Sequence, residues 1–269
     1  MPPPQPSPSS AALITGASSG IGAEIARLLA MRGHGVVLVA RREDRLRELA
    51  TKLGAAHGVR SEAIGADLET ESGRDAMAGA VAELGLDIEI LVNNAGFGDG
   101  GRLHAAERRK LERMVRLNCE ALLDLQARYV PAMVERGRGS VINIASMAGM
   151  QPVPGTATYA ATKAFALSLS EATHAELAGT GVGVTAVCPG PVKTEFGALA
   201  GVEASEHHLA ERYWTPVAEV AEEAVSGAER NQRVVVPGGA LNRIGAVAGR
   251  HAPRAIQLPL TRRLWERNT

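Results

Sequence analysis

Aromatic residues and cysteines are scarce in this chain of 269 residues, and neither sign of charge is in excess. Only three Phe, three Tyr and two Trp are present. Two cysteines, Cys119 and Cys188, are too few for a disulfide framework, and we expect free thiols in a reducing compartment. No apolar run approaches the roughly 18–20 residues of a membrane-spanning helix. Lys plus Arg (29) balances Asp plus Glu (29), so a basic footprint for nucleic acid is absent.

The two ends of the chain differ in composition from the middle. Four of the first six residues are proline, which predicts an extended, disordered tail over residues 1–10. This tail lacks the basic and apolar regions of a secretory signal, so we expect a cytoplasmic protein. Residues 241–269 hold six arginines against one acid, Glu266, and form a basic C-terminal extension.

Between these ends, short β-branched runs alternate with longer helical stretches. We predict strands over 11–15, 36–40, 59–66, 88–93, 140–145, 182–188 and 234–236, and helices over 22–31, 43–53, 69–84, 106–135, 157–177 and 217–228. The run VVLV at 36–39 suits a sheet buried on both faces. The alternation predicts an α/β fold, a doubly wound parallel sheet of the Rossmann type with about seven strands and helices on both faces. We expect one catalytic domain over 11–240, with a substrate lid at about 195–213. Thr215 is placed to cap the last helix, with Pro216 in its first turn.

A glycine-rich turn follows the first strand and opens the first helix. Glycines at this point allow a tight turn and let backbone N–H groups approach a pyrophosphate at the helix N-terminus. The alternative is a turn with a structural role only. The cofactor-binding residues predicted here are Gly16, Ser18, Ser19, Gly20, Ile21 and Gly22.

Two arginines follow the second strand, where the adenosine ribose of a dinucleotide is expected. An acid here would accept from the ribose 2′-hydroxyl and repel a 2′-phosphate, but the strand tip carries none. Arg41 and Arg42 can instead pair with phosphate, which predicts NADP(H) over NAD(H). The alternative is that both arginines begin a solvated helix and pair with Glu43 and Asp44.

Five separated motifs give the chain a resemblance to the short-chain dehydrogenase/reductase family, in its single-domain subclass of about 250 residues. They are TGASSGIG at 15–22, AD at 66–67, NNAG at 93–96, Ser146 with Tyr159-x-x-x-Lys163, and PGPVKT at 189–194. The resemblance runs from about residue 11 to residue 238. It implies an oxidoreductase that uses a nicotinamide cofactor.

The spacing of Tyr159 and Lys163 places both on one face of a predicted helix. A free tyrosine has a pKa of ~10, and a neighbouring ammonium favours the phenolate. We therefore expect Lys163 to lower the pKa of Tyr159, which acts as the general acid/base. Ser146 follows a predicted strand end, where its hydroxyl can donate to a substrate carbonyl oxygen.

The resemblance implies roles for further residues. Asn118 lies within a predicted helix, where asparagine is a poor helix former, and the resemblance implies that it holds a water in a proton relay. A solvated or locally bonded Asn118 is the alternative. Asn93 is expected to brace the sheet. The other cofactor contacts implied are Asp67, Leu68, Asn94, Ala95, Gly96, Pro189, Gly190, Val192 and Thr194, together with Tyr159 and Lys163.

The few aromatic residues gather near the expected crevice. Phe97, Phe196, Tyr213 and Trp214 suggest an apolar or ring-containing carbonyl substrate, or alternatively packing of the lid. No metal site is predicted, because the seven histidines are scattered and His207-His208 is only a pair.

The sequence leaves three functional hypotheses and several partners. The first is an NADP(H)-dependent reductase or dehydrogenase for a carbonyl or secondary alcohol. The second is a 3-oxoacyl-thioester reductase, and the third is a non-catalytic NADP(H)-binding sensor. The resemblance implies a homodimer or homotetramer formed through the helices near 106–135 and 157–177. For residues 241–269 we favour packing on a partner subunit or at the pocket over membrane contact.

Overall fold

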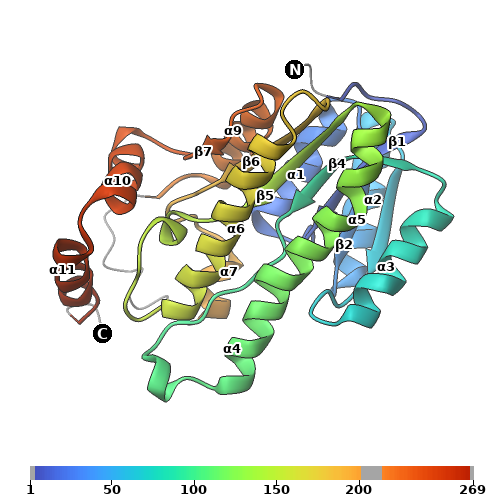
Figure 1. Cartoon of the computed structure of the whole chain (residues 1–269). Coiled ribbons are helices and arrows are strands. Elements are labelled where there is room, and N and C mark those ends of the chain that lie inside the picture. The colour runs from blue at the N-terminus through green and yellow to red at the C-terminus, as the bar shows by residue number, and fades with distance from the viewer. Residues whose placement is uncertain (1–3, 201–213, 267–269) are drawn as a thin grey trace.

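The computed structural model describes residues 4–200 and 214–266. Its centre is a seven-stranded, fully parallel sheet in the order β3-β2-β1-β4-β5-β6-β7 (Figure 1). The strands are β1 (Ser10–Thr15), β2 (Gly35–Ala40), β3 (Ser61–Gly65), β4 (Asp87–Asn93), β5 (Gly139–Ile144), β6 (Val182–Val187) and β7 (Val234–Val235).

Helices cover both faces of this sheet (Figure 1). The α-helices are α1 (Gly20–Met31), α2 (Glu43–His57), α3 (Glu71–Glu83), α4 (Arg108–Val115), α5 (Leu122–Arg136), α6 (Ala157–Glu176), α7 (Glu195–Ala200), α9 (Val217–Glu229), α10 (Ala240–His251) and α11 (Arg254–Glu266). The short elements are the 3-10 helices η1 (Leu103–Ala105) and η3 (Met147–Met150), and the π-helix η2 (Arg116–Ala121).

Two large hydrophobic cores cover opposite faces of the sheet, and a third cluster lies around α6 and η3. One core joins α1, α2 and α9 to the sheet through residues such as Ile25, Leu46 and Val225. The other joins α3 and α5 to the opposite face through residues such as Met77 and Leu125. All six residues of β1 are buried, as a strand in the middle of a parallel sheet must be. The predicted doubly wound α/β fold is confirmed.

The order of the strands fixes where a ligand can bind. β1 lies between β2 and β4, so the connections on its two sides lead in opposite directions. In open α/β sheets the crevice at this switch point, outside the carboxyl ends of the strands, is the ligand site. The residues that follow β1, β2, β4, β5 and β6 therefore meet at one edge.

Two local predictions differ from the structure. The end of the predicted tail belongs to the sheet: Ser10 is buried in β1, and the Asp87 N–H donates to Ser9 O at 2.9 Å. The predicted cap of α9 is wrong, since Pro216 occupies the N-cap position. Thr215 instead accepts a hydrogen bond from Asn242 Nδ2 at 3.1 Å, which ties α10 to the strand edge.

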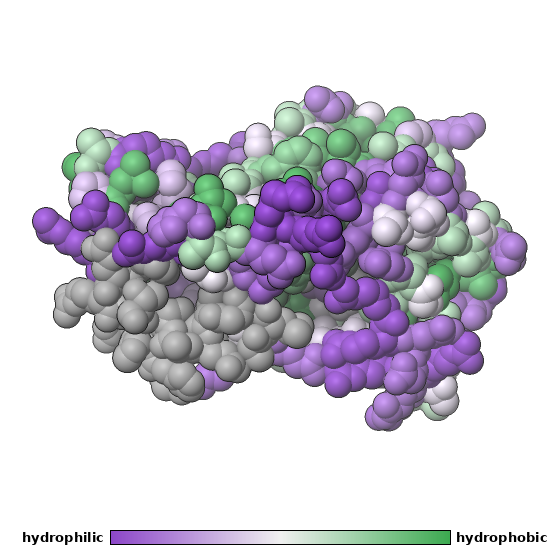
Figure 2. Space-filling model, turned by 90° about the horizontal axis from the view of Figure 1, so that it is seen from below, coloured by the Kyte–Doolittle hydropathy of each residue, from purple (hydrophilic) through white to green (hydrophobic). Residues whose placement is uncertain are grey.

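The basic C-terminal segment forms α10 and α11, which lie to one side of the molecule, away from the sheet (Figure 1). Gln257 of α11 caps the end of α10 by donating to Ala248 O at 3.0 Å. Figure 2 views the molecule from below and shows hydrophobic side chains beside hydrophilic ones at this end. Within residues 4–200 and 214–266, no helix has the length and apolar content to cross a bilayer. The large exposed apolar side chains of the two helices are Leu241, Ile244, Val247, Ile256, Leu258 and Leu260.

Candidate active site

The glycine-rich loop joins β1 to α1 and is held against the end of β4. Gly16 has a φ of 65° and Gly20 a φ of 59°, a left-handed conformation that favours glycine. A Cβ on Gly22 would overlap Asn94 Nδ2 and would lie 2.7 Å from Gly16 O. Asn94 Nδ2 donates to Thr15 O at 2.9 Å, which links the loop to β4. The loop is therefore a cradle that only glycine backbone fits, with α1 opening directly behind it.

The Thr15 hydroxyl, at the end of β1, binds the backbone of the segment that follows β4. Thr15 Oγ1 accepts hydrogen bonds from the N–H groups of Asn94 and Ala95, both at 3.0 Å. Asn93 Nδ2 donates to Asn143 Oδ1 at 2.9 Å, so Asn93 does brace β4 against β5. Ile21 packs against the core below the loop.

The two predicted phosphate-binding arginines have different partners. Arg42 donates to Ser18 Oγ at 2.9 Å and to Ser19 Oγ at 2.8 Å, so its guanidinium lies on the glycine-rich loop. Arg41 instead lies 3.3 Å from a carboxylate oxygen of Glu69, which also pairs with Arg113. Arg42, Ser18 and Ser19 thus make a cluster of hydrogen-bond donors where β2 ends.

A carboxylate from a distant segment also reaches this cluster. Glu195, the first residue of α7, accepts from Arg42 at 2.7 Å and from Arg45 at 2.8 Å. These hydrogen bonds hold the pKa of Glu195 at about 2, so the group is charged. Sequence reasoning missed Glu195 and Arg45. No spacing signal could find Glu195, which lies 153 residues from Arg42.

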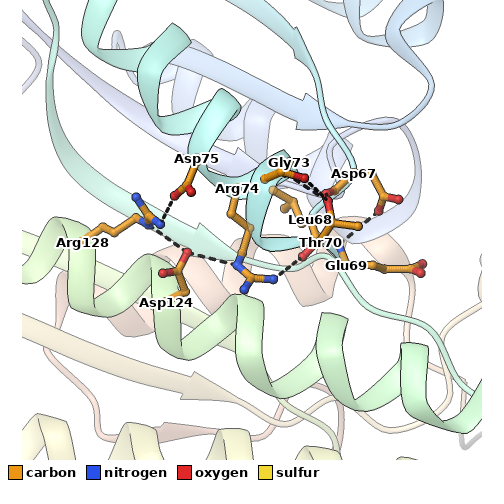
Figure 3. A network of polar contacts seen from close by, with 10 residues as sticks. Asp67, Leu68, Glu69, Thr70, Gly73, Arg74, Asp75, Asp124 and Arg128 are labelled. Atoms are coloured by element: carbon orange, nitrogen blue, oxygen red, sulfur yellow. Dashed lines mark hydrogen bonds and ion pairs between the residues drawn. The ribbon is translucent and has the colours of Figure 1, made fainter.

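The loop after β3 carries Asp67 and Leu68 and is fixed by Arg74 of α3 (Figure 3). The buried Arg74 donates to Leu68 O at 3.1 Å and pairs with Asp124 of α5 at 3.2 Å. Asp67 is exposed at the crevice and accepts from the Glu69 N–H at 3.1 Å. The Leu68 side chain is 4% exposed and belongs to the core.

Ser146, Tyr159 and Lys163 converge where β5 meets α6. Ser146 begins η3, and its Oγ accepts from the Ala148 N–H at 3.1 Å. Its side chain lies close enough to the Tyr159 phenol to favour the ionised form of that group. Lys163 Nζ lies 5.8 Å from the centroid of the Tyr159 ring and donates to Ile144 O at 2.7 Å. The three groups predicted to do the chemistry therefore share one small volume.

The pKa values of Tyr159 and Lys163 differ from the expectation. Burial raises the pKa of Tyr159 to about 12, and the interaction with the Ser146 side chain lowers that pKa by a smaller amount. Burial also lowers the pKa of Lys163 to about 8. The predicted lowering of the Tyr159 pKa by Lys163 is thus not seen in the chain alone. The physical reason is that desolvation outweighs the attraction of an ammonium that is bonded to Ile144 O.

Asn118 lies in the π-helix η2, between α4 and α5, and is buried. Its side chain is bonded within the protein: Oδ1 accepts from the Phe97 N–H at 3.1 Å, and Nδ2 donates to Thr162 Oγ1 at 3.0 Å. A Cβ on Gly96 would lie 2.9 Å from Asn118 Oδ1 and 3.6 Å from Lys163 Nζ. The poor helix-forming residue thus marks a local break in α-helical geometry, a feature common at functional sites.

The segment after β6 closes the other side of the crevice. Pro189 O accepts from the Met147 N–H at 3.0 Å, and Val192 pairs with Thr215 in a single β-bridge. A Cβ on Gly190 would meet Asn242 Nδ2 at 3.3 Å, so α10 packs closely on this segment. A Cβ on Gly20 would lie 3.4 Å from Thr194 Cγ2, which places Thr194 beside the glycine-rich loop.

Two of the predicted aromatic substrate residues lie beside reactive or charged groups. The Phe196 ring centroid is 5.5 Å from that of Tyr159, and Lys193 Nζ is 5.7 Å from the Trp214 ring. Phe97 is held through its backbone by Asn118. Tyr213 and the pair His207-His208 lie outside the described residues. Within the described ranges, no three His, Cys, Asp or Glu side chains gather as metal ligands.

Comparison with known proteins shows the family. The family model for short chain dehydrogenase matches residues 10–202. A short-chain dehydrogenase from Sphingobium yanoikuyae, solved with NADPH, is 38% identical with a TM-score of 0.79, and the match covers 94% of this chain and 95% of that one. This chain therefore belongs to the short-chain dehydrogenase/reductase family, and it is an oxidoreductase acting on CH–OH and C=O groups.

Two further relatives are similar over most of their length. The bulky-bulky ketone specific alcohol dehydrogenase from Comamonas testosteroni is 33% identical with a TM-score of 0.76, covering 96% of this chain and 93% of its own. An NADP-dependent 3-hydroxy acid dehydrogenase of Salmonella typhi is 38% identical over 189 residues, 70% of this chain and 75% of that protein. Relatives of this chain thus include NADP-dependent enzymes.

Proposed function

We propose that the chain is an NADP(H)-dependent oxidoreductase that transfers a hydride between nicotinamide and a carbonyl or secondary alcohol. Tyr159 is its general acid/base. The observation that carries this proposal is the convergence of Ser146, Tyr159 and Lys163 beside a glycine-only loop. A sensor without catalysis has no need of that convergence.

The residues at the crevice fit a dinucleotide. The backbone of Gly16, Gly20 and Gly22 would hold the pyrophosphate at the N-terminus of α1, whose positive dipole end favours an anion. Asp67 lies at the adenine end, and Arg42 offers a planar guanidinium to the 2′-phosphate. The segments predicted to line the nicotinamide side are Asn94, Ala95, Gly96, Pro189, Gly190, Val192 and Thr194.

The bound cofactor supplies a hydride to the carbonyl carbon, and the chain supplies the proton. Because its pKa is raised, Tyr159 keeps its phenol proton at neutral pH and can donate it to the carbonyl oxygen. Ser146, whose side chain interacts with that of Tyr159, would orient the same oxygen. The Lys163 ammonium stabilises the phenolate left after transfer. Asn118 positions the loop beside Lys163 and, as family membership implies, holds a water of the proton relay.

We propose an apolar, bulky carbonyl substrate. Phe196 extends the apolar wall beside Tyr159, and Trp214 lies close to Lys193 on the same side. A relative named as specific for bulky ketones supports this choice. Residues 195–213 remain the proposed lid, of which α7 is the described part.

A 3-oxoacyl-thioester substrate is the second candidate, and one observation favours it. A cavity of about 360 Å³ lies between α11 and Pro154, and Arg262 and Arg263 line it. Basic residues beside an apolar cavity suit the phosphate and acyl chain of a phosphopantetheine arm. Reduction of 3-oxoacyl-thioesters in preference to bulky aryl ketones would favour this candidate.

Exposed side chains and the packing of α10 bear on the predicted oligomer and on the role of the C-terminal extension. Val115, Leu123 and Phe165 are exposed on α4, α5 and α6, the helices predicted to form a homodimer or homotetramer. α10 frames the site through Asn242 and Thr215, which supports packing at the pocket over membrane contact. A cytoplasmic location stays a prediction.

The test of the cofactor proposal is a paired titration with NADPH and NADH, followed by nicotinamide fluorescence. We expect NADPH to bind at least tenfold more tightly, a difference of about 1.4 kcal/mol. Arg42→Ala should remove most of this preference and leave NADH binding unchanged. Equal binding of the two cofactors by the unaltered chain would contradict the proposed preference.

A further inference from the structure

Glu195 bridges two arginines at the start of α2. One carboxylate oxygen accepts from Arg42 at 2.7 Å and the other from Arg45 at 2.8 Å. The two arginines therefore share a single anion. Neither bond follows from nearness in sequence, since 153 and 150 residues separate the partners.

The Arg42 guanidinium links the Glu195 carboxylate to the glycine-rich loop. While Arg42 Nη1 donates to Glu195, its Nη2 lies 2.9 Å from Ser18 Oγ and 2.8 Å from Ser19 Oγ. This place, where β2 ends, is where the adenosine ribose of a dinucleotide lies in a doubly wound sheet. The tip of β2 has no acid of its own, and Glu195 brings one there from α7.

We infer that Glu195 is a specificity-determining residue for the dinucleotide: its carboxylate competes with the cofactor 2′-phosphate for Arg42 and Arg45. The inference rests on the proposed function, because it concerns the site proposed for NADP(H). It also assigns Arg45 to the phosphate site as a second cationic ligand.

The charges of the competing groups determine whether Glu195 raises or lowers the affinity for NADPH. A phosphate monoester carries about −1.5 to −2 charges and three acceptor oxygens, so it takes both guanidinium groups in preference to a carboxylate. Binding must still break both Glu195 bonds and place two anions near each other. A dinucleotide without the 2′-phosphate leaves these bonds intact. Glu195 therefore lowers the affinity for NADPH and leaves that for NADH nearly unchanged.

The solvent exposure of the three side chains determines how much Glu195 changes the affinity for NADPH. The side chains of Arg42, Arg45 and Glu195 are 40%, 48% and 48% exposed. Exposed ion pairs are screened by water and salt, so we expect a change in affinity of about fivefold. The effect should shrink as the salt concentration rises.

Glu195→Gln tests the inference, because it keeps the shape of the side chain and removes its charge. We expect the Kd for NADPH to fall about fivefold and the Kd for NADH to stay within about twofold. Glu222→Gln is the matched control: Glu222 lies on α9, is 51% exposed and accepts from Arg32 at 2.7 Å. It changes the net charge equally and should leave both Kd values unchanged.

The outcomes separate this inference from the cofactor proposal. If Glu195→Gln binds NADPH no more tightly than Glu222→Gln does, the inference is overturned, whichever cofactor the unaltered chain prefers. The ratio of NADPH to NADH affinity in the unaltered chain tests the proposed preference separately. Adding Arg45→Gln to Glu195→Gln should reverse part of the gain, and an unchanged Kd would exclude Arg45 from the phosphate site.

Discussion

Replacing Lys163 by Met should make the protein more tolerant of denaturant at neutral pH and less so at alkaline pH, relative to the unaltered chain. Lys163 is 6% exposed, and burial lowers its pKa from 10.5 to about 8. Keeping the ammonium charged inside the fold therefore costs folding free energy below pH 8. Methionine has a similar length and no charge.

The size of the effect follows from the two pKa values. A shift of 2.5 units corresponds to about 3 kcal/mol of destabilisation where lysine is fully protonated. Between the folded and unfolded pKa values the unfolded chain binds more protons, so stability rises with pH in that window. Between pH 7 and pH 10 the cost should fall by about 2.5 kcal/mol. Loss of the bond to Ile144 O is a separate cost that does not depend on pH.

The assay is urea denaturation of both proteins at pH 7 and at pH 10. The free energy of unfolding of Lys163→Met, taken relative to the unaltered chain, should decrease by about 2.5 kcal/mol over this range. The neighbours Tyr159 and Cys119 have pKa values of about 12 and about 11, so in the folded proteins both stay largely neutral up to pH 10 and should add little to the difference. Lys52→Met, at a lysine that is 70% exposed, is the control and should show little change. A difference for Lys163→Met that is independent of pH would refute the account of this buried ammonium.

Two further substitutions test the loops around the cofactor site. Gly22→Ala places a Cβ against Asn94 Nδ2 and Gly16 O, so we expect at least tenfold weaker NADPH binding and about 1–3 kcal/mol lower stability; Gly79→Ala, which meets nothing within 4 Å, should not weaken binding, and equal behaviour of the two would contradict the cradle. Arg74→Met leaves Leu68 O without its buried donor and should lower the free energy of unfolding by about 2 kcal/mol in urea denaturation. Arg128→Met, at the more exposed partner of Asp124, should cost under about 1 kcal/mol, and an equal loss would argue against a special role for the buried arginine.

The fold was predictable because its physical signals are local. Strands such as β1 and β2 are largely apolar runs, and an α-helix lies between each strand and the next, so the alternation alone indicates a parallel sheet. The ends of the strands and helices were harder to predict, because contacts with residues distant in sequence determine where an element begins and ends. Ser10 joins β1 by pairing with Asp87 at the start of β4, and Thr215 bonds α10 instead of capping α9.

The reacting groups were predictable from motif and spacing, but their ionisation was not. Tyr159 and Lys163 lie four residues apart, so a helix brings them to one face. Whether burial or charge dominates their pKa values depends on surrounding atoms such as Ile144 O. Asn118 gave a usable local signal, since asparagine fits poorly in a helix and the structure has a π-helix there.

Contacts between segments distant in sequence lay beyond sequence reasoning. Arg42 was expected to bind phosphate, but its bond to Glu195 depends on how the segment after β6 folds back over α2. Leu68 illustrates the reverse case. It lies in a motif implied to touch the cofactor, yet its side chain fills the core and its carbonyl bonds Arg74.

The most direct test of the central claim is the turnover of Tyr159→Phe with NADPH and a bulky aryl ketone. This substitution removes one hydroxyl and keeps the ring that packs 5.5 Å from Phe196. We predict a loss of turnover of at least about 100-fold, the usual contribution of a positioned general acid. The Kd for NADPH should stay within a few fold. Turnover equal to that of the unaltered chain would contradict the assignment of Tyr159 as the general acid/base.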